Sequence, residues 1–318
     1  MKFSIVITYL KQGSPEVLES IKKMDYPKKD YEILCLPGSG SPSIYRNKGA
    51  DIGKGKIIVF IDDDAMVHED LLKNAEKLFD KHSEIDIVGG PQLTPLDEKG
   101  FARISGYALS SKFGGWNTSN RYESKKLNLN ADDTYLTTAI MFCRKEVFKK
   151  VRFDENLFPG EDSKFVIEAK KEGFRIAYSP ELIVYHRRRP TIKKFVKQIS
   201  SYGKTTSARE SIFNLIKRPF FIVPSLFLVY IIELSFFGIM KPSIFKNIFG
   251  ILTGSVNFFS IILFPLVLYL FLSFIFSIYE SFRNKDIRAI LFLPLIFPLL
   301  HLSYGIGLMW GFLIKKKN

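Results

Sequence analysis

Three consecutive aspartates, Asp62-Asp63-Asp64, directly follow the apolar run from Ile57 to Ile61. A run of β-branched and aromatic residues of this length is typical of a buried strand. Because neighbouring carboxylates repel and raise one another's pKa values, we expect a positive partner: a metal ion, a basic cluster or both. Alternate side chains of an extended segment point the same way, so Asp62 and Asp64 can offer hard oxygens to Mg²⁺ or Mn²⁺. The alternative is a solvated acidic turn that caps the next helix.

A second acidic pair, Glu161-Asp162, stands in the segment FPGEDSKF at the expected start of a helix. The helix dipole favours anions at that position. One of these carboxylates could act as a general base and take a proton from an attacking hydroxyl. The alternative is that the pair only caps the helix.

Basic groups that could complete a site with these acids stand in two places. In the segment HRRRP, His186 can ligate a metal, and Arg187 with its neighbours can clamp a diphosphate. For Arg188-Arg189, a contact with lipid headgroups is an equal alternative. Arg46-Asn47, on the expected helix after the turn PGSGSPS, could face the same crevice.

The elements that must position these groups alternate between strand and helix patterns. Expected strands cover 2–9, 31–36, 57–61 and 85–89, and expected helices cover 14–24, with Ser14 as N-cap, 43–54 and 68–81. A later strand, a helix from Glu161 and a last strand ending at His186 follow. This alternation predicts an α/β fold with a parallel sheet covered by helices. Ligands of such sheets bind outside the carboxyl ends of the strands, where the three aspartates lie.

The composition of the chain changes near Lys217-Arg218-Pro219. Before this boundary it is that of a soluble globular domain, and after it Phe, Leu, Ile and Val dominate. Three later segments, 220–240, 256–279 and 287–314, meet the requirement of roughly 20 apolar residues for a helix that crosses a bilayer. Segment 243–254 is too polar for such a helix. A buried helical core is the less favoured alternative.

The net charge of +14 is concentrated before the first apolar segment. Between Arg187 and Arg218 the chain has ten Lys and Arg residues against one acid, Glu210. Basic residues beside a membrane span indicate a cytoplasmic position and contacts with anionic lipid. A nucleic-acid partner is the weaker interpretation, because a membrane anchor follows immediately.

The expected location is a cell membrane crossed more than once, with the preceding domain in the cytoplasm. The N-terminal MKFSIVITYL alternates like a strand, and its apolar stretch is too short for a signal peptide. Cys35 and Cys143 lack metal-ligand spacing and are compatible with a reducing compartment. Three spans would place Lys315-Lys316-Lys317 outside, against the positive-inside trend, whereas two or four spans would not.

The order of these motifs resembles the family 2 glycosyltransferases of the GT-A fold. An N-terminal strand, the segment RNKGA, a strand ending in DDD, the segment GED and a final YHRRRP follow one another as in that family. The resemblance covers residues 1 to about 210, and the tail LHLSYGIGLMWGFL, 300–313, also looks like the end of membrane-anchored members. It implies a GT-A catalytic domain over 1–210, a basic juxtamembrane segment over 191–218 and a transmembrane region over 219–318.

The resemblance also implies roles for the residues named above. Asp162 would be the catalytic base, and Glu161 would support it or the acceptor. The nucleotide sugar would contact five residues: Thr8, Arg46, Asp62, Asp63 and Arg187. Mg²⁺ or Mn²⁺ would be held by Asp62, Asp64 and His186. The positive partner that the aspartates require would then be this cation with its substrate.

The implied activity is inverting, metal-dependent transfer of a sugar from a UDP- or GDP-linked donor to a lipid-linked or glycan acceptor at the cytoplasmic membrane face. The family's Asp-rich segment after the second strand is replaced here by CLPGSGSPS, so Ser39, Ser41 or backbone groups would recognise the base. Two alternatives remain: an Mg²⁺-dependent phosphotransferase with an aspartyl nucleophile, and a non-catalytic membrane scaffold of the same fold. Processive synthesis with export is less favoured, because three spans make a poor channel.

Overall fold

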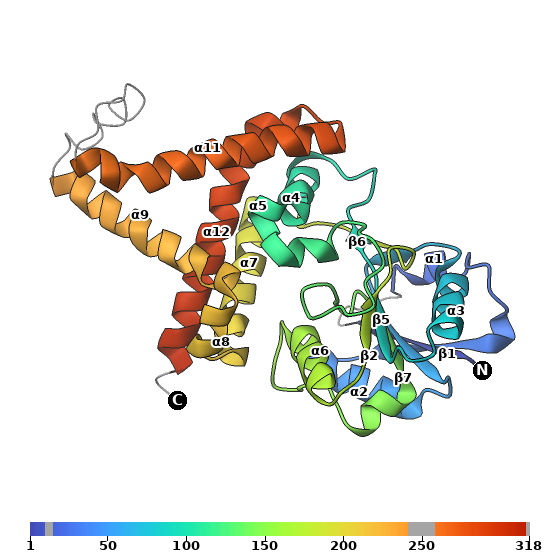
Figure 1. Ribbon diagram of the computed structural model, residues 1–318. Coiled ribbons are helices and arrows are strands. Elements are labelled where there is room, and N and C mark those ends of the chain that lie inside the picture. Colours follow the sequence, from blue (N-terminus) through green and yellow to red (C-terminus); the bar gives the residue numbers. More distant parts are fainter. Residues whose placement is uncertain (10–14, 241–257, 316–318) are drawn as a thin grey trace. The chain divides into compact units, whose positions relative to one another are not determined.

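The computed structural model describes residues 1–9, 15–240 and 258–315 (Figure 1). It divides into two compact units, which we call the α/β unit and the helical unit. The α/β unit consists of Met1–Ala102 and Asn117–Arg188, and the helical unit consists of Arg103–Trp116 and Arg189–Asn318. A short segment in the middle of the α/β unit's sequence is therefore part of the helical unit.

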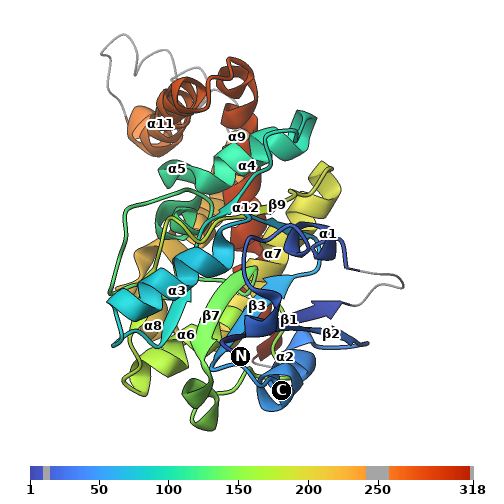
Figure 2. The same ribbon diagram turned by 90° about the vertical axis from the view of Figure 1, so that its right-hand side faces the viewer.

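The described residues of the α/β unit form a six-stranded sheet in the order β2-β1-β3-β7-β5-β8. The strands are β1 (Phe3–Tyr9), β2 (Tyr31–Pro37), β3 (Ile57–Asp62), β5 (Ile87–Gly89), β7 (Ile140–Arg144) and β8 (Ile176–Tyr178). Figure 2 shows β2, β1, β3 and β7 side by side. Strand β7 runs antiparallel to both of its neighbours, and the other described pairs of this sheet are parallel. The expected sheet is thus mostly parallel, and β7 is the strand that departs from the expectation.

Helices cover both faces of the sheet because successive side chains of its strands point to opposite sides. One apolar core joins Ile5 and Val59 to α1 (Leu18–Ile21) and α3 (Leu71–Lys81). The other joins Val6, Ile58 and Phe60 to α2 (Pro42–Ile52) and α6 (Glu161–Lys171). Figure 1 shows α3 on one side of the sheet and α2 with α6 on the other. The result is a three-layered α/β/α fold.

A second, three-stranded sheet lies beside the carboxyl ends of the main strands. Its order is β4 (Ala65–Val67), β9 (Val184–His186) and β6 (Gln92–Leu93). Strand β9 pairs antiparallel with β4, so that His186 stands opposite Ala65. This pairing brings the HRRRP segment next to the three aspartates.

The expected strands and helices agree with the structure to within a few residues, with one larger departure. The helix expected over 14–24 is a single turn, Leu18–Ile21, and Ser14 lies outside the described residues. The backbone N–H of Val17 donates instead to the carbonyl of Asp63, which ties this turn to the end of β3. In the part of the chain that the structure describes, four short 3₁₀ segments are also present: Lys28–Asp30, Trp116–Arg121, Lys145–Lys149 and Pro219–Phe221.

The helical unit contains three long apolar helices and several shorter ones. Val223–Met240 (α9), Ser260–Asn284 in α11 (Phe258–Asn284) and Arg288–Ile314 in α12 (Arg288–Lys315) are long and apolar enough to cross a membrane. They correspond to the three expected segments, whereas 243–254 lies outside the described residues. The shorter helices are α4 (Gly100–Ser110), α5 (Lys112–Gly115), α7 (Ile192–Arg209) and α8 (Ile212–Lys217). Within this unit α7 lies against α12.

Candidate active site

The three aspartates lie at the edge of the sheet where the parallel strands end. Asp62 is the last residue of β3 and stands opposite Thr8 near the end of β1. Asp63 and Asp64 form the turn into β4, and all three side chains are partly exposed. Thr8 and the aspartates therefore meet at one edge, as the sequence predicts.

His186 joins the aspartates through the pairing of β9 with β4. Its Nε2 atom lies 3.2 Å from Asp64 Oδ1 and 3.7 Å from Asp62 Oδ2. One ligand atom from each of these three residues lies within 4.8 Å of the other two. Two carboxylates and an imidazole that converge in this way fit a divalent cation such as Mn²⁺ or Mg²⁺. The expected metal-ligand set is thus brought together.

The electrostatics of this cluster reflect three crowded groups. Burial raises the pKa of the Asp62 carboxyl, and the charges of Arg46 and His186 only partly oppose that rise. Burial alone would lower the pKa of His186, but the hydrogen bond to Asp64 and the charges of both aspartates outweigh it and leave the pKa raised. The raised pKa favours the protonated imidazole next to the acids, and a cation bound here would compete with that proton.

Arg46 connects the DDD segment to the GED segment. Its Nη1 donates to Glu161 Oε1 at 2.5 Å, and its Nη2 donates to Asp62 Oδ1 at 3.4 Å. The guanidinium is only 7% exposed and lies 5.8 Å from the ring centroid of Phe153. A planar guanidinium can serve two carboxylates at once because its donors point in fixed, separate directions. Arg46 thereby holds the start of α6 next to the end of β3.

The two carboxylates of the GED segment differ in exposure. Glu161 is buried, and its Oε2 atom has no hydrogen-bond partner among the described residues. Burial raises the pKa of Glu161 to about 7, a rise that Arg46 opposes and the charge of Asp162 supports. Asp162 is partly exposed, and its Oδ1 accepts from the backbone N–H of Ser163 at 2.6 Å. Of the pair, Asp162 is the carboxylate that a substrate can reach.

Asn47 does not face the crevice and instead holds the loop before α6. Its Oδ1 accepts from the N–H of Phe153 at 3.0 Å, and its Nδ2 donates to the carbonyl of Phe153 at 2.9 Å. Nδ2 also donates to Glu155 at 3.0 Å. The expectation that Asn47 lines the site is wrong, because its side chain is buried against this loop.

The arginines of the HRRRP segment have different surroundings. Arg187 is 49% exposed and pairs with Asp97 at 2.9 Å and Glu98 at 3.9 Å. Arg188 is buried; it donates to Thr94 Oγ1 at 3.0 Å and to the carbonyl of Gln92, and it lies 4.8 Å from the ring centroid of Tyr122. Arg188 therefore supports the small sheet and is not available to lipid headgroups. No signal in the sequence points to this role, because it depends on the pairing of β6 with β9.

The turn PGSGSPS between β2 and α2 offers polar groups that the sequence only partly indicated. The hydroxyl oxygens of Ser41 and Ser43 are buried without a hydrogen-bond partner among the described residues. Tyr45 Oη contacts both backbone polar groups of Ser39, at 3.2 and 3.3 Å. Ser43 and Tyr45 were not foreseen, although their position in the first turns of α2 was a usable signal.

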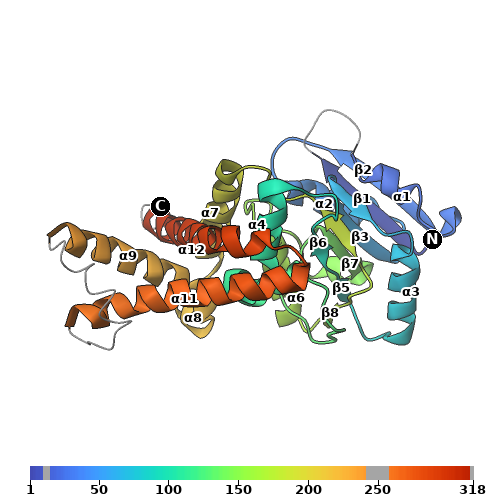
Figure 3. The same cartoon turned by 90° about the horizontal axis from the view of Figure 1, so that it is seen from above.

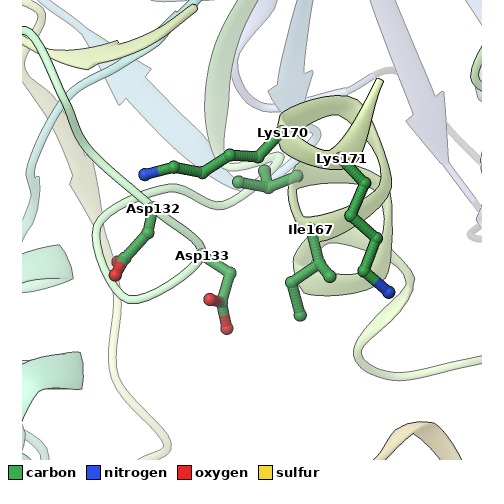
Figure 4. A pocket seen from close by; sticks show the side chains of 6 residues that line it. Asp132, Asp133, Ile167, Lys170 and Lys171 are labelled. Atoms are coloured by element: carbon green, nitrogen blue, oxygen red, sulfur yellow. The ribbon is translucent and has the colours of Figure 1, made fainter. Parts of the chain in front are cut away.

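A shallow hollow of about 240 Å³ lies between α6 and the turn at Asp132 and Asp133. Figure 4 shows these two aspartates on a loop that faces Ile167 and Lys170 of α6. Lys170 Nζ donates to Asn130 Oδ1 at 3.0 Å and to the carbonyl of Ala131 at 2.9 Å. None of the site residues named above lines this hollow, and we assign it no role in the candidate active site.

Residues 2–200 match the family model described as "Glycosyltransferase like family 2". The chain belongs to this family. The protein is accordingly a glycosyltransferase of the GT-A fold, and the corresponding sequence predictions are confirmed.

Two curated relatives and one solved structure are similar to this chain. Dolichyl N-acetyl-alpha-D-glucosaminyl phosphate 3-beta-D-2,3-diacetamido-2,3-dideoxy-beta-D-glucuronosyltransferase of Methanococcus voltae is 25% identical over 277 residues, which cover 76% of this chain and 81% of the relative. Minor teichoic acid biosynthesis protein GgaB of Bacillus subtilis is 29% identical over 169 residues, 51% of this chain but only 17% of that protein. The mannosyltransferase PcManGT from Pyrobaculum calidifontis, solved with GDP-Man and Mn²⁺, is 12% identical with a TM-score of 0.54 and covers 99% of this chain and 88% of its own. At that identity the structural likeness concerns the fold alone.

Proposed function

We propose that this family 2 glycosyltransferase is an inverting, metal-dependent enzyme that moves a sugar from a nucleotide diphosphate to a lipid-linked acceptor at the cytoplasmic membrane face. One observation carries the proposal. Asp62 and Asp64, His186, and Glu161-Asp162 come from three segments far apart in the sequence; His186 contacts the two aspartates, and Arg46 joins Asp62 to Glu161. This arrangement supplies both a cation site and a nearby carboxylate.

The cation would be held by Asp62, Asp64 and His186. When bound, Mg²⁺ or Mn²⁺ supplies positive charge that stabilises the leaving nucleoside diphosphate. The oxygen ligands suit both cations, and the imidazole makes Mn²⁺ the better fit of the two. Mn²⁺ in the structurally similar mannosyltransferase supports this choice.

Asp162 would be the general base that takes the proton of the acceptor hydroxyl. It is the accessible member of the pair, whereas Glu161 is buried and bound to Arg46. A base on the acceptor side allows the hydroxyl to attack in one displacement, which inverts the anomeric centre. Glu161 would fix the start of α6, so that Asp162 keeps its orientation.

The nucleotide would contact Thr8, Asp62 and Asp63 at the strand ends, with the hydroxyls of Ser41 and Ser43 available for the base. Arg46 would act on the nucleotide through Asp62, since its Nη1 and Nη2 atoms each donate to a carboxylate. Arg187 would have to leave Asp97 to face the diphosphate, a change that its exposed position permits. Both UDP- and GDP-sugars remain compatible with these groups.

The acceptor would be lipid-linked, and the helical unit would hold the enzyme at the bilayer. Two features support this. Three helices are apolar and long enough to span a membrane. The name of the relative that matches over most of its length describes a dolichyl phosphate-linked acceptor.

Donor turnover tests the proposal. Full-length protein is incubated with a panel of UDP- and GDP-sugars and Mn²⁺, with and without membrane lipid extract, and released nucleoside diphosphate and lipid-linked sugar are measured. We expect release that needs the cation and rises with the lipid extract. Full turnover in EDTA contradicts the metal assignment. Release of nucleoside monophosphate together with sugar phosphate indicates a phosphotransferase, and no turnover with any donor indicates a scaffold.

A further inference from the structure

The helices α9 and α11 form an antiparallel pair. The rings of Phe227 and Tyr269 stack with centroids 4.2 Å apart, and Tyr230 Oη donates to the carbonyl of Ile262 at 2.8 Å. Farther along α9, Leu234 packs against Leu263. From the Phe227–Tyr269 contact to the Leu234–Leu263 contact, residue numbers rise along α9 and fall along α11, and Figure 3 shows both helices in the left-hand part of the view. The start of α9 and the later part of α11 therefore lie at the same end of the pair.

The other end of the pair exposes a nearly continuous apolar surface. Its large exposed side chains are Ile232, Phe236, Phe237, Ile239, Met240, Ile261, Phe264 and Leu268. A soluble protein rarely exposes such a surface, and a lipid bilayer is the partner that its chemistry fits. Glu233 is the one acid in α9, and the many apolar side chains around it offset the cost of its insertion.

The junction between α11 and α12 is held by polar groups of α4. Asp286 accepts a hydrogen bond from Tyr107 Oη at 3.2 Å and lies 3.7 Å from Arg103 Nε. Arg283 donates to Ser110 Oγ at 2.6 Å. Such a cluster of charges has a far lower free energy at a membrane surface than in hydrocarbon. The beginning of α12 thus lies at the polar level.

The middle of α12 is tied to α5. His301 Nε2 lies 3.0 Å from the carbonyl of Phe113, and His301 Nδ1 lies 2.8 Å from Tyr269 Oη. The ring of Phe113 also packs against Tyr269 and Phe297. These contacts hold α5 against the end of the pair where α9 begins.

The later part of α12 packs tightly against α7. A methyl group on Gly307 would come within 1.9 Å of the carbonyl oxygen of Ser200, and one on Gly203 within 2.2 Å of that of Tyr304. Tyr304 Oη also donates to Thr206 Oγ1 at 3.0 Å. The outer face of α7 carries four exposed lysines: Lys193, Lys194, Lys197 and Lys204. A helix with these charges cannot lie in hydrocarbon, so its neighbour along this length is at the polar level too.

We infer that α12 does not cross the membrane, although its composition would allow it. Polar contacts with α4 lie just before its first residue, its middle contacts α5, and its last part packs against the lysine-bearing α7. Figure 1 shows its later part turning away from α11 toward α7 and α8, and Pro294 and Pro298 lie before that turn, where kinks are expected. The α9–α11 pair would then be the part that enters the bilayer, with α12 lying across its base at the interface.

In this arrangement both ends of α12 are on the membrane face from which the chain continues into the α/β unit. The segments that bind α12 continue directly into the α/β unit at residues 102–103, 116–117 and 188–189. Lys315-Lys316-Lys317 would therefore be cytoplasmic, which agrees with the positive-inside trend that three spans would break. Exposed Leu291, Leu295 and Trp310 on α12 suit an interfacial helix.

The inference rests on the proposed membrane attachment, and labelling in sealed proteoliposomes separates the two. Single cysteines are placed at Lys81→Cys on α3, Ile287→Cys at the α11–α12 junction and Lys317→Cys, in a full-length background with Cys35→Ser and Cys143→Ala that retains transferase activity. A membrane-impermeant maleimide is applied before and after detergent. We expect all three sites to label to the same extent from the same side.

Labelling of Lys317→Cys and Ile287→Cys from opposite sides would overturn the inference, because α12 would then span. Labelling of Ile287→Cys from the side opposite Lys81→Cys would also overturn it. Removal of the protein from the vesicles by alkaline carbonate would defeat the membrane attachment itself. That result differs from the two labelling outcomes above, because in a protein that leaves the vesicles no site is protected from the maleimide by the membrane.

Discussion

The two units use the same kinds of polar group in different ways. In the α/β unit, carboxylates, an imidazole and a guanidinium gather at the open edge of a sheet, where three of them fit a cation. In the helical unit, an equally dense set around Asp286 and Arg283 joins helices to one another. The charged groups at the strand ends can accept a ligand, whereas the charged groups between helices hold those helices together. Substitutions should therefore affect chemistry in the first unit and assembly in the second.

The contacts within the helical unit limit where the chain can be truncated. A cut at Arg218 follows the change in composition, but it would remove α11 and α12 from under α4, α5 and α7. The truncated chain would then expose faces that are buried in the full protein. Point variants in the full chain are the sounder test of either unit.

The largest effect is expected from Asp64→Ala, which removes a candidate cation ligand. Loss of the cation's charge stabilisation should lower turnover about 10³-fold or more, together with Mn²⁺-dependent nucleotide binding. Initial rates and calorimetric titration of nucleotide with and without Mn²⁺ measure this. Asp80→Ala, an acid on α3 outside the site, should change neither quantity. Normal activity of Asp64→Ala in EDTA would remove the metal assignment.

The next effect is expected from Asp162→Asn, which keeps the size of the side chain but cannot take the proton. We expect a fall in kcat of at least about 10²-fold with nearly unchanged donor affinity, since the interaction is made mainly in the transition state. Steady-state kinetics and donor titration separate the two quantities. Glu161→Gln is the control: if it is dead while Asp162→Asn turns over, the two roles are exchanged. If both are active, the GED segment is only a helix cap.

A smaller effect is expected from Arg46→Lys. Lysine keeps the charge but cannot bridge Asp62 and Glu161, so α6 should lose its fixed position relative to β3. We expect kcat to fall about tenfold, equivalent to about 1.4 kcal/mol, with a lesser change in donor affinity. The matched control is Arg152→Lys, whose ion pair with Asp51 is exposed and outside the site. Weakened donor binding with normal kcat would show that Arg46 serves the nucleotide alone.

Much of the α/β unit could be predicted from the sequence because its signals are local. Apolar runs mark β1 and β3, and the acids that follow β3 mark the ligand edge. The meeting of His186 with Asp64 could not be read in this way, because it depends on the pairing of β9 with β4, about 120 residues apart. The buried places of Arg188 and Asn47 depend on similar long-range contacts.

The helical unit was less predictable for a physical reason. Hydropathy reports how apolar a helix is, but not which neighbours cover it. It found α9, α11 and α12 equally, although α12 is the one that follows the junction held by α4 and that contacts α5 at its middle and α7 along its last part. The glycines at 203, 307 and 311 were the available signal, since closely packed helices need small residues at their contact.

The smallest effect concerns the pH dependence of stability, and Glu161→Gln tests it. The pKa of Glu161 is raised by burial to about 7 in the folded protein, above its value in the unfolded chain. The folded state therefore binds this proton more tightly, and the contribution to stability is full below about pH 4.5 and is lost as the pH rises through about 7. Glutamine resembles the protonated acid, so the difference in Tm between Glu161→Gln and the wild type should shift in favour of the variant from pH 5 to pH 8.

Thermal melts across that range measure this difference in Tm. The control is Tyr304→Phe in the helical unit. It should lose about 1 kcal/mol of stability for one hydrogen bond, and this loss should not vary with pH. If the difference in Tm between Glu161→Gln and the wild type does not change with pH, Arg46 keeps Glu161 ionised throughout. The carboxylates of the site would then pair with Arg46 much as Asp286 pairs with its neighbours in the helical unit, and the two units would differ less in their use of charge.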